Sequence, residues 1–221
     1  MIDTLLSILA PHHCCSCGQT GRLLCDNCKY NIISELKTTC LACGRPSGAA
    51  GVCNTCRVPY QQAWCVGDRK DVLQRLIGLY KFKRTRSAYR VLAELLLETL
   101  PVLPSDTVIV PLPTVAGHVR ERGYDHTALI ARYVAKRRGL RYRPVIKRAT
   151  HTTQRHSNAA QRISQAKHAF AVESAVNPNV TYVIIDDIVT TGASIRYAAQ
   201  ALRDAGATRV WVAVIARQIL D

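Results

Sequence analysis

Two adjacent carboxylates, Asp186 and Asp187, are the residues of this chain that most need a chemical explanation. They follow Val183, Ile184 and Ile185, a β-branched apolar run that is typical of a strand buried on both faces. Two like charges at the end of such a strand are costly unless a ligand or a cation offsets them. The pair is therefore a candidate binding site.

The turn that follows the acids leads into the next predicted helix and consists of Thr190, Thr191, Gly192, Ala193 and Ser194. Backbone N–H groups at a helix N-terminus form an anion site, because the helix dipole adds to their partial positive charge. A phosphate on this turn, with hydroxyl groups bound to the acids directly or through a divalent cation, describes one ligand. That ligand is a ribose 5-phosphate.

All ten cysteines lie between residues 14 and 65, and eight of them form four Cys-x-x-Cys pairs. Seven, eleven and nine residues separate successive pairs, which is typical of zinc ribbons, since each pair offers two thiolates to a tetrahedral metal. The simplest pairing gives two groups of four, Cys14, Cys17, Cys25 and Cys28, and Cys40, Cys43, Cys53 and Cys56. An interleaved pairing stays open. We expect Cys15 to be a spare residue, and Cys65 lies outside the pattern.

The composition predicts a double zinc-ribbon module at residues 1–60 and an α/β domain at 61–221. Predicted helices (71–80, 88–100, 127–138, 194–204) alternate with predicted strands (107–110, 180–185, 210–215). This alternation predicts a parallel sheet with helices on both faces, whose ligands sit at the carboxyl ends of the strands. The first eleven residues predict a short helix capped by Asp3 or Thr4, too short to span a bilayer.

The formal net charge is +15, and most of the excess follows residue 60. Such a surface attracts polyanions, either phosphate-rich small molecules or nucleic acid. The alternative is a solvated basic face that only keeps the protein soluble. Paired cysteines without a secretion signal favour metal thiolates in a reducing cytosol over disulfides.

The segment from Tyr182 to Ser194 resembles the ribosyl-phosphate signature of the type I phosphoribosyltransferases: four apolar residues, two acids, two apolar residues and Thr-Thr-Gly. The resemblance implies that fold and binding of phosphoribosyl pyrophosphate (PRPP) with Mg²⁺. It also implies a pyrophosphate side at Pro111, Leu112 and Pro113 with the arginines that follow. Residues 147–170 look like the mobile loop that closes over PRPP, which would make Gln154, Arg162 and Lys167 its catalytic side chains.

The whole chain resembles the ComF, or GntX-type, family of competence proteins. The resemblance rests on cysteine pairs ahead of this domain, Lys81-Phe82 after an apolar helix, and Val110–Pro113 followed by Arg-x-Arg-Gly-aromatic. The family usually has Gly-Phe-Asn-Gln where this chain has Gly123-Tyr124-Asp125-His126. Membership implies a cytoplasmic protein of natural transformation that handles incoming single-stranded DNA. The expected DNA contacts are Lys81, Lys83, Arg84, Arg86, Arg120, Arg122, Arg141 and Arg143, with Tyr89, Tyr124, Tyr133 and Tyr142 as candidate stacking platforms.

Three functions follow from these patterns. The first is a protein that binds PRPP and single-stranded DNA. The second is an enzyme that transfers the phosphoribosyl group to a base or amine with release of pyrophosphate. The third is a PRPP sensor whose zinc ribbons dock a helicase or translocation partner.

Overall fold

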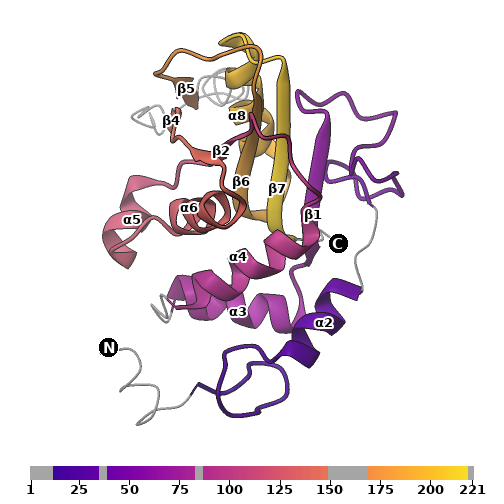
Figure 1. Cartoon of the computed structure of the whole chain (residues 1–221), viewed down its shortest axis with the longest axis vertical. Coiled ribbons are helices and arrows are strands. Elements are labelled where there is room, and N and C mark those ends of the chain that lie inside the picture. The colour runs from indigo at the N-terminus through magenta and orange to yellow at the C-terminus, as the bar shows by residue number, and fades with distance from the viewer. Residues whose placement is uncertain (1–11, 35–38, 83–86, 149–168, 219–221) are drawn as a thin grey trace, which may run out of the picture.

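A five-stranded parallel sheet forms the centre of the computed structural model, in the order β1-β7-β6-β2-β3 (Figure 1). The structure describes residues 12–34, 39–82, 87–148 and 169–218. The strands are β1 (Gln62–Asp68), β2 (Val108–Pro111), β3 (Arg141–Tyr142), β6 (Thr181–Val189) and β7 (Arg209–Arg217). A separate antiparallel ribbon consists of β4 (Ile146–Arg148) and β5 (Phe170–Val172).

Helices cover both faces of the sheet. They are α2 (Asp26–Ser34), α3 (Asp71–Phe82), α4 (Ala88–Thr99), α5 (Ala116–Arg122), α6 (His126–Arg138) and α8 (Ala193–Asp204). Side chains alternate along β6, so Val183 and Ile185 pack in one core with α3, α4 and α6, whereas Ile184 packs in the other core with α8. The predicted α/β architecture is confirmed.

The predicted elements are present with small shifts at their ends. The largest shift concerns β6, whose predicted end is residue 185 and which continues to Val189. It continues because β7 still pairs with it on one side, as far as Val189 opposite Arg217. The edge strand β1, the short strand β3 and helix α5 are not predicted by the sequence. The predicted helix near Asp3 and Thr4 falls outside the described residues.

The two cysteine groups lie at different places on the domain. In Figure 1 the first, in indigo, lies beyond α2 and α3, and the second, in purple, lies beside β1. Each begins with a knuckle turn closed by glycine in the left-handed region, Gly18 at φ +79° and Gly44 at φ +76°. The four cysteines of each group lie together in space, so the fold adopts the sequential arrangement of the pairs.

The second cysteine group is attached directly to the sheet. Leu41 and Tyr60 are buried in the same core as α8. The backbone N–H of Ala63 in β1 donates to the carbonyl oxygen of Ala50 at 2.8 Å. These contacts cross the predicted boundary at residue 60, so the division into 1–60 and 61–221 stays a prediction. None of the helices in the described ranges has the length and apolar character needed to cross a bilayer.

Candidate functional site

The two acids lie inside β6, at a point where one edge of the strand opens. On the β2 side pairing ends at Pro111 opposite Ile185, whereas on the β7 side it continues past the acids. The backbone N–H of Leu112 makes one last bond, to the carbonyl oxygen of Ile185 at 2.8 Å. Within the described residues, the stretch from Asp186 onward therefore has no strand beside it on the β2 side, which is how ligand crevices form in parallel sheets.

Asp187 points toward the helices of the α3/α6 face and is held there by two basic side chains. Its Oδ2 atom lies 2.5 Å from Nζ of Lys81 and 3.0 Å from Nε2 of His126. Asp187 and His126 are buried, with exposed side-chain fractions of 6% and 7%, and Lys81 is largely covered at 14%. Burial alone would raise the pKa of Asp187, but His126 and Lys81 outweigh it and lower this pKa below its usual value.

Asp186 has a different set of partners. Its Oδ1 atom accepts a hydrogen bond of 2.8 Å from the backbone N–H of Asp187. Burial and the neighbouring charge of Asp187 raise the pKa of Asp186 well above its usual value. The pair thus consists of one carboxylate whose charge is stabilised by basic neighbours, Asp187, and one whose charge is disfavoured by burial, Asp186. Perturbed pKa values of this kind are common at functional sites.

The turn after β6 has the predicted form. Thr190, Thr191, Ala193 and Ser194 are exposed, and Gly192 stands at the start of α8 with φ +74°. No side chain caps this helix at Gly192. The N–H of Ala193 makes a long hydrogen bond of 3.4 Å to Oγ1 of Thr191. The turn stands at the positive end of a twelve-residue helix, which suits an anion.

The structure brings the predicted pyrophosphate side next to the acids. Pro111 ends β2 opposite β6, and the segment through Leu112 and Pro113 leads to α5, which has no buried side chain. Arg122 ends α5 and places Nη1 at 3.1 Å from Nδ1 of His126. Asp125 then caps α6, since its Oδ1 accepts from the N–H of Ala128 at 3.0 Å.

His126 is a site residue that reasoning from the sequence missed. It precedes Asp187 by sixty-one positions and forms no recognisable motif with it. The signal that could have found it is its place at the start of α6, the second helix after β2, since the carboxyl end of β2 adjoins β6.

The predicted closing loop lies largely outside the described residues, and so do Gln154, Arg162 and Lys167. Its base is described: β4 and β5 pair antiparallel with Arg148 opposite Phe170. The guanidinium carbon of Arg148 lies 4.9 Å from the centre of the Phe170 ring. The catalytic roles expected of the three loop side chains stay predictions.

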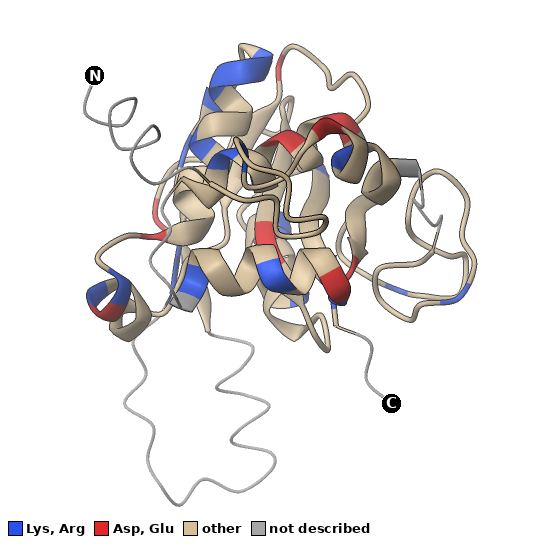
Figure 2. Ribbon diagram, turned by 90° about the horizontal axis from the view of Figure 1, so that it is seen from below, with Lys and Arg blue, Asp and Glu red and all other residues tan. Residues whose placement is uncertain are grey.

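The basic surface differs from expectation at Lys81, which pairs with the buried Asp187 and is reassigned to the candidate site. Lys83, Arg84 and Arg86 fall outside the described residues. Arg120 and Arg122 are on α5, and Arg141 and Arg143 are exposed at β3. The last turn of α6 adds Lys136, Arg137 and Arg138, and Figure 2 shows Lys and Arg gathered at one end of a long helix.

Most of the expected aromatic platforms are already covered. Arg132 lies over the ring of Tyr142 at 5.1 Å, and Arg137 lies over that of Tyr133 at 5.9 Å. Tyr124 stacks on the buried Tyr80 at 5.5 Å between ring centres and belongs to the core. The surface around α6 and β3 therefore presents basic side chains to a nucleic acid more readily than aromatic rings on which bases could stack.

The eight paired cysteines form two compact groups of potential metal ligands. Within Cys14, Cys17, Cys25 and Cys28, and within Cys40, Cys43, Cys53 and Cys56, the sulfur atoms all lie within 4.8 Å of one another. The Sγ atoms of Cys17 and Cys25 are 3.7 Å apart, as are those of Cys43 and Cys53. Sulfur atoms at zinc–sulfur distances of about 2.3 Å on a tetrahedron are roughly 3.8 Å apart. Both groups could hold zinc, in the sequential pairing, and Cys15 and Cys65 belong to neither.

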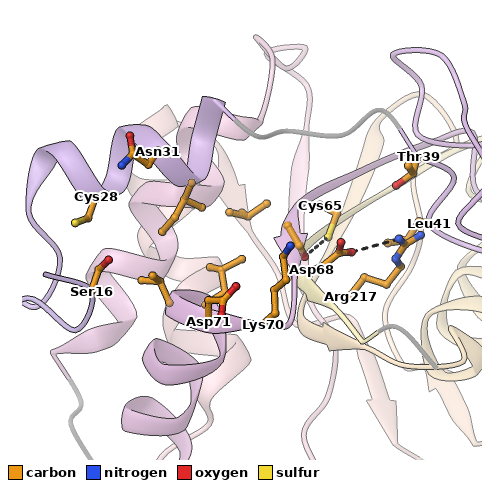
Figure 3. Close-up of a pocket in the computed structure, with 15 residues that line it drawn as sticks. Ser16, Cys28, Asn31, Thr39, Leu41, Cys65, Asp68, Lys70, Asp71 and Arg217 are labelled. Atoms are coloured by element: carbon orange, nitrogen blue, oxygen red, sulfur yellow. Dashed lines mark hydrogen bonds and ion pairs between the residues drawn. The ribbon is translucent and has the colours of Figure 1, made fainter. Parts of the chain in front are cut away.

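A cavity of about 180 Å³ lies apart from the acid pair, between the two cysteine groups and the ends of β1 and β7 (Figure 3). Asp68 and Arg217 form an ion pair of 3.2 Å in its wall. Arg217 also donates from Nη1 to the carbonyl oxygen of Cys40 at 3.4 Å. The cavity marks the seam where the second cysteine group meets the sheet.

Comparison with known proteins supports the fold and gives the family. Residues 133–219 match the family described as the phosphoribosyl transferase domain. The chain is 31% identical over 210 residues to the DNA utilization protein YhgH of Escherichia coli (strain K12), covering 89% of this chain and 91% of that protein. It is 23% identical over 194 residues to competence protein ComFC of Bacillus subtilis (strain 168), covering 83% and 79%.

Among solved structures, the glutamine PRPP amidotransferase from B. subtilis, complexed with ADP and GMP, is 22% identical. The TM-score is 0.43, and the match covers 58% of this chain and 26% of that one. The sheet, the flanking helices, the matched domain and the two tetracysteine groups together agree with the phosphoribosyltransferase-type fold preceded by zinc ribbons. The chain belongs to the ComF family of competence and DNA-utilization proteins.

Proposed function

We propose that this protein binds PRPP with Mg²⁺ at the acid pair and single-stranded DNA on its basic surface, and that it acts in DNA uptake or use in the cytoplasm. The observation that carries the PRPP part is the position of Asp186 and Asp187 on the open edge of β6, next to the uncapped start of α8. Hydroxyls of a ribose on the acids and its 5-phosphate on the turn would satisfy both features.

The DNA part rests on charge. The exposed Arg141 and Arg143 adjoin the basic last turn of α6, and the chain as a whole carries +15. Single-stranded DNA bound mainly through its phosphates would show little sequence preference and a strong dependence on salt. The names of the relatives, DNA utilization protein and competence protein, agree with such a ligand.

Calorimetry with PRPP and Mg²⁺ tests the first part. Asp186→Asn should weaken binding by about 10-fold or more, because the amide keeps one accepting oxygen for a hydroxyl but has no charge to offer a cation. Ribose 5-phosphate alone should bind more weakly than PRPP. An unchanged affinity in the Asn variant would remove the acid pair from the site.

Fluorescence anisotropy with a labelled oligothymidylate, repeated across salt concentrations, tests the second part. Replacing Arg141 and Arg143 by Gln should lower the slope of log affinity against log salt by about 0.7 for each phosphate that the protein no longer neutralises. A slope that does not change would place DNA elsewhere. Repeating the calorimetry with DNA present would show whether the two ligands are coupled.

A further inference from the structure

The side chains around Asp187 form a clamp whose geometry fixes the proton on His126. The guanidinium of Arg122 can only donate hydrogen bonds, and its Nη1 atom lies 3.1 Å from Nδ1 of His126. Nδ1 must therefore be the accepting nitrogen, and Nε2 carries the proton. That N–H faces Oδ2 of Asp187 at 3.0 Å. In this tautomer the protonated Nε2 is the ring nitrogen that lies beside Oδ2 of Asp187.

Two tyrosine hydroxyls hold the arms of this clamp together. Tyr124 Oη donates to the carbonyl oxygen of Tyr80 at 2.5 Å, and Tyr80 Oη donates to that of His126 at 2.8 Å. Tyr80 immediately precedes Lys81 and is fully buried. The end of α3, which carries Lys81, is therefore tied to the start of α6, which carries His126.

Both arms converge on one oxygen of the carboxylate. Lys81 Nζ and His126 Nε2 each approach Oδ2 of Asp187, at 2.5 Å and 3.0 Å. The clamp therefore fixes the rotamer of the side chain and keeps it ionised in spite of burial, and both of its contacts engage Oδ2 rather than Oδ1. A carboxylate held in this way is preorganised, so no reorientation is needed when a hydroxyl group binds.

We propose that Lys81 and His126 are positioning residues of the sugar-phosphate site, which clamp Oδ2 of Asp187 so that Oδ1 meets a ribose hydroxyl. Arg122 acts through His126 by fixing its tautomer, and it links the predicted pyrophosphate side to the acid pair. This inference rests on the proposed binding of PRPP, but the state of His126 can be measured without any ligand.

The first measurement is a nitrogen-15 NMR spectrum of the full-length protein labelled at histidine. The His126 signals, assigned by their disappearance in His126→Gln, should show a bare Nδ1 and a protonated Nε2 near pH 7. Arg122→Met should remove this preference and allow the other tautomer. An imidazolium, or a proton on Nδ1 in the wild-type protein, would overturn the clamp.

The second measurement is PRPP affinity by calorimetry in three variants. His126→Phe keeps a planar ring without donor or acceptor, and Lys81→Met keeps the side-chain stem without its charge. Each should weaken binding by about 10- to 100-fold, the range expected for one hydrogen bond to a charged group. His126→Gln can donate to Asp187 and accept from Arg122, so it should retain affinity within about threefold.

Lys70→Met, at an exposed lysine just before α3, is the matched control and should bind like the wild type. Thermal unfolding of each variant shows whether it is folded before titration. Wild-type affinity in His126→Phe, or a weakening in His126→Gln equal to that in His126→Phe, would refute the positioning role. If the wild-type protein takes up no PRPP, the proposed function fails, and the NMR result alone decides for or against the clamp.

Discussion

The two acids should respond to the same isosteric change with opposite effects on stability. In Asp187→Asn the ammonium of Lys81, only 14% exposed, is deprived of its negative partner. Breaking a buried pair on one side costs about 3–5 kcal/mol. In Asp186→Asn the amide oxygen still accepts from the N–H of residue 187, but a charge that is desolvated and close to a like charge is gone. The free energy of unfolding should rise by about 1–2 kcal/mol.

The change in the free energy of unfolding caused by each Asn variant should depend on pH, and in opposite directions for the two acids. The pKa of Asp186 is raised in the folded state, so the wild type becomes less stable as pH rises above about 4, the unfolded value, and the advantage of Asp186→Asn grows over the same range. The pKa of Asp187 is lowered, so the deficit of Asp187→Asn is full above about pH 4 and shrinks below it. Both cysteine groups are common to all proteins compared, so any effect of metal release at low pH cancels in the differences.

Urea unfolding followed by tryptophan fluorescence measures these effects. Trp64 on β1 and Trp211 on β7 are the two tryptophans of the chain, and their rings meet edge to face at 5.7 Å. Their signal reports the integrity of the sheet directly beside β6. Equal destabilisation by both Asn variants would show that the acids share one environment, and the asymmetric description of the pair would be wrong.

Three further outcomes test other parts of the structure. Leu41→Ala should lower the free energy of unfolding by about 2–4 kcal/mol in the same assay, because Leu41 is 5% exposed in the α8 core, whereas the exposed Asn54→Ala should change it by less than about 0.5 kcal/mol. Equal effects would mean that the second cysteine group folds independently of the sheet. Removing zinc with a chelator should shift the Trp64 signal, since β1 is bonded to that group; an unchanged spectrum with zinc measured as absent would contradict this. Arg217→Met should lower the unfolding midpoint, because it leaves Asp68, whose side chain is 15% exposed, without its ion-pair partner. Arg57→Met, on the exposed surface, should leave the midpoint unchanged.

The sequence was sufficient to predict the elements whose pattern is local. The continuous apolar run before Asp186 predicts a buried parallel strand, and residues 194–204 predict a helix; both are present. The four Cys-x-x-Cys pairs predict metal-binding groups, because the spacing between the ligands can be read directly from the sequence. The choice between sequential and interleaved pairing was not local, since it depends on how residues 29–39 cross from one group to the other.

What the sequence did not predict depends on contacts between distant segments. The edge strand β1 carries a cysteine, a glycine and a polar end, so its pattern is weak, and it forms because β7 offers a partner along most of its length. The basic stretch around Lys81 predicts an exposed side chain. Its burial follows from the packing of α3 against the sheet, which brings its ammonium to Asp187 across more than a hundred residues.

The same packing changes how the acid pair is understood. From the sequence, two neighbouring aspartates look like equivalent ligands for two hydroxyl groups. The two carboxylates instead have different partners, since Lys81 and His126 lie within 3.0 Å of Asp187 whereas Asp186 accepts from the backbone N–H of Asp187. These partners stabilise the charge on Asp187, while burial and the charge of Asp187 disfavour the charge on Asp186 until a ligand or a metal ion arrives. Affinity for a divalent cation should therefore depend mainly on Asp186, whereas Asp187 should contribute both to the fold and to the contact with a ribose hydroxyl.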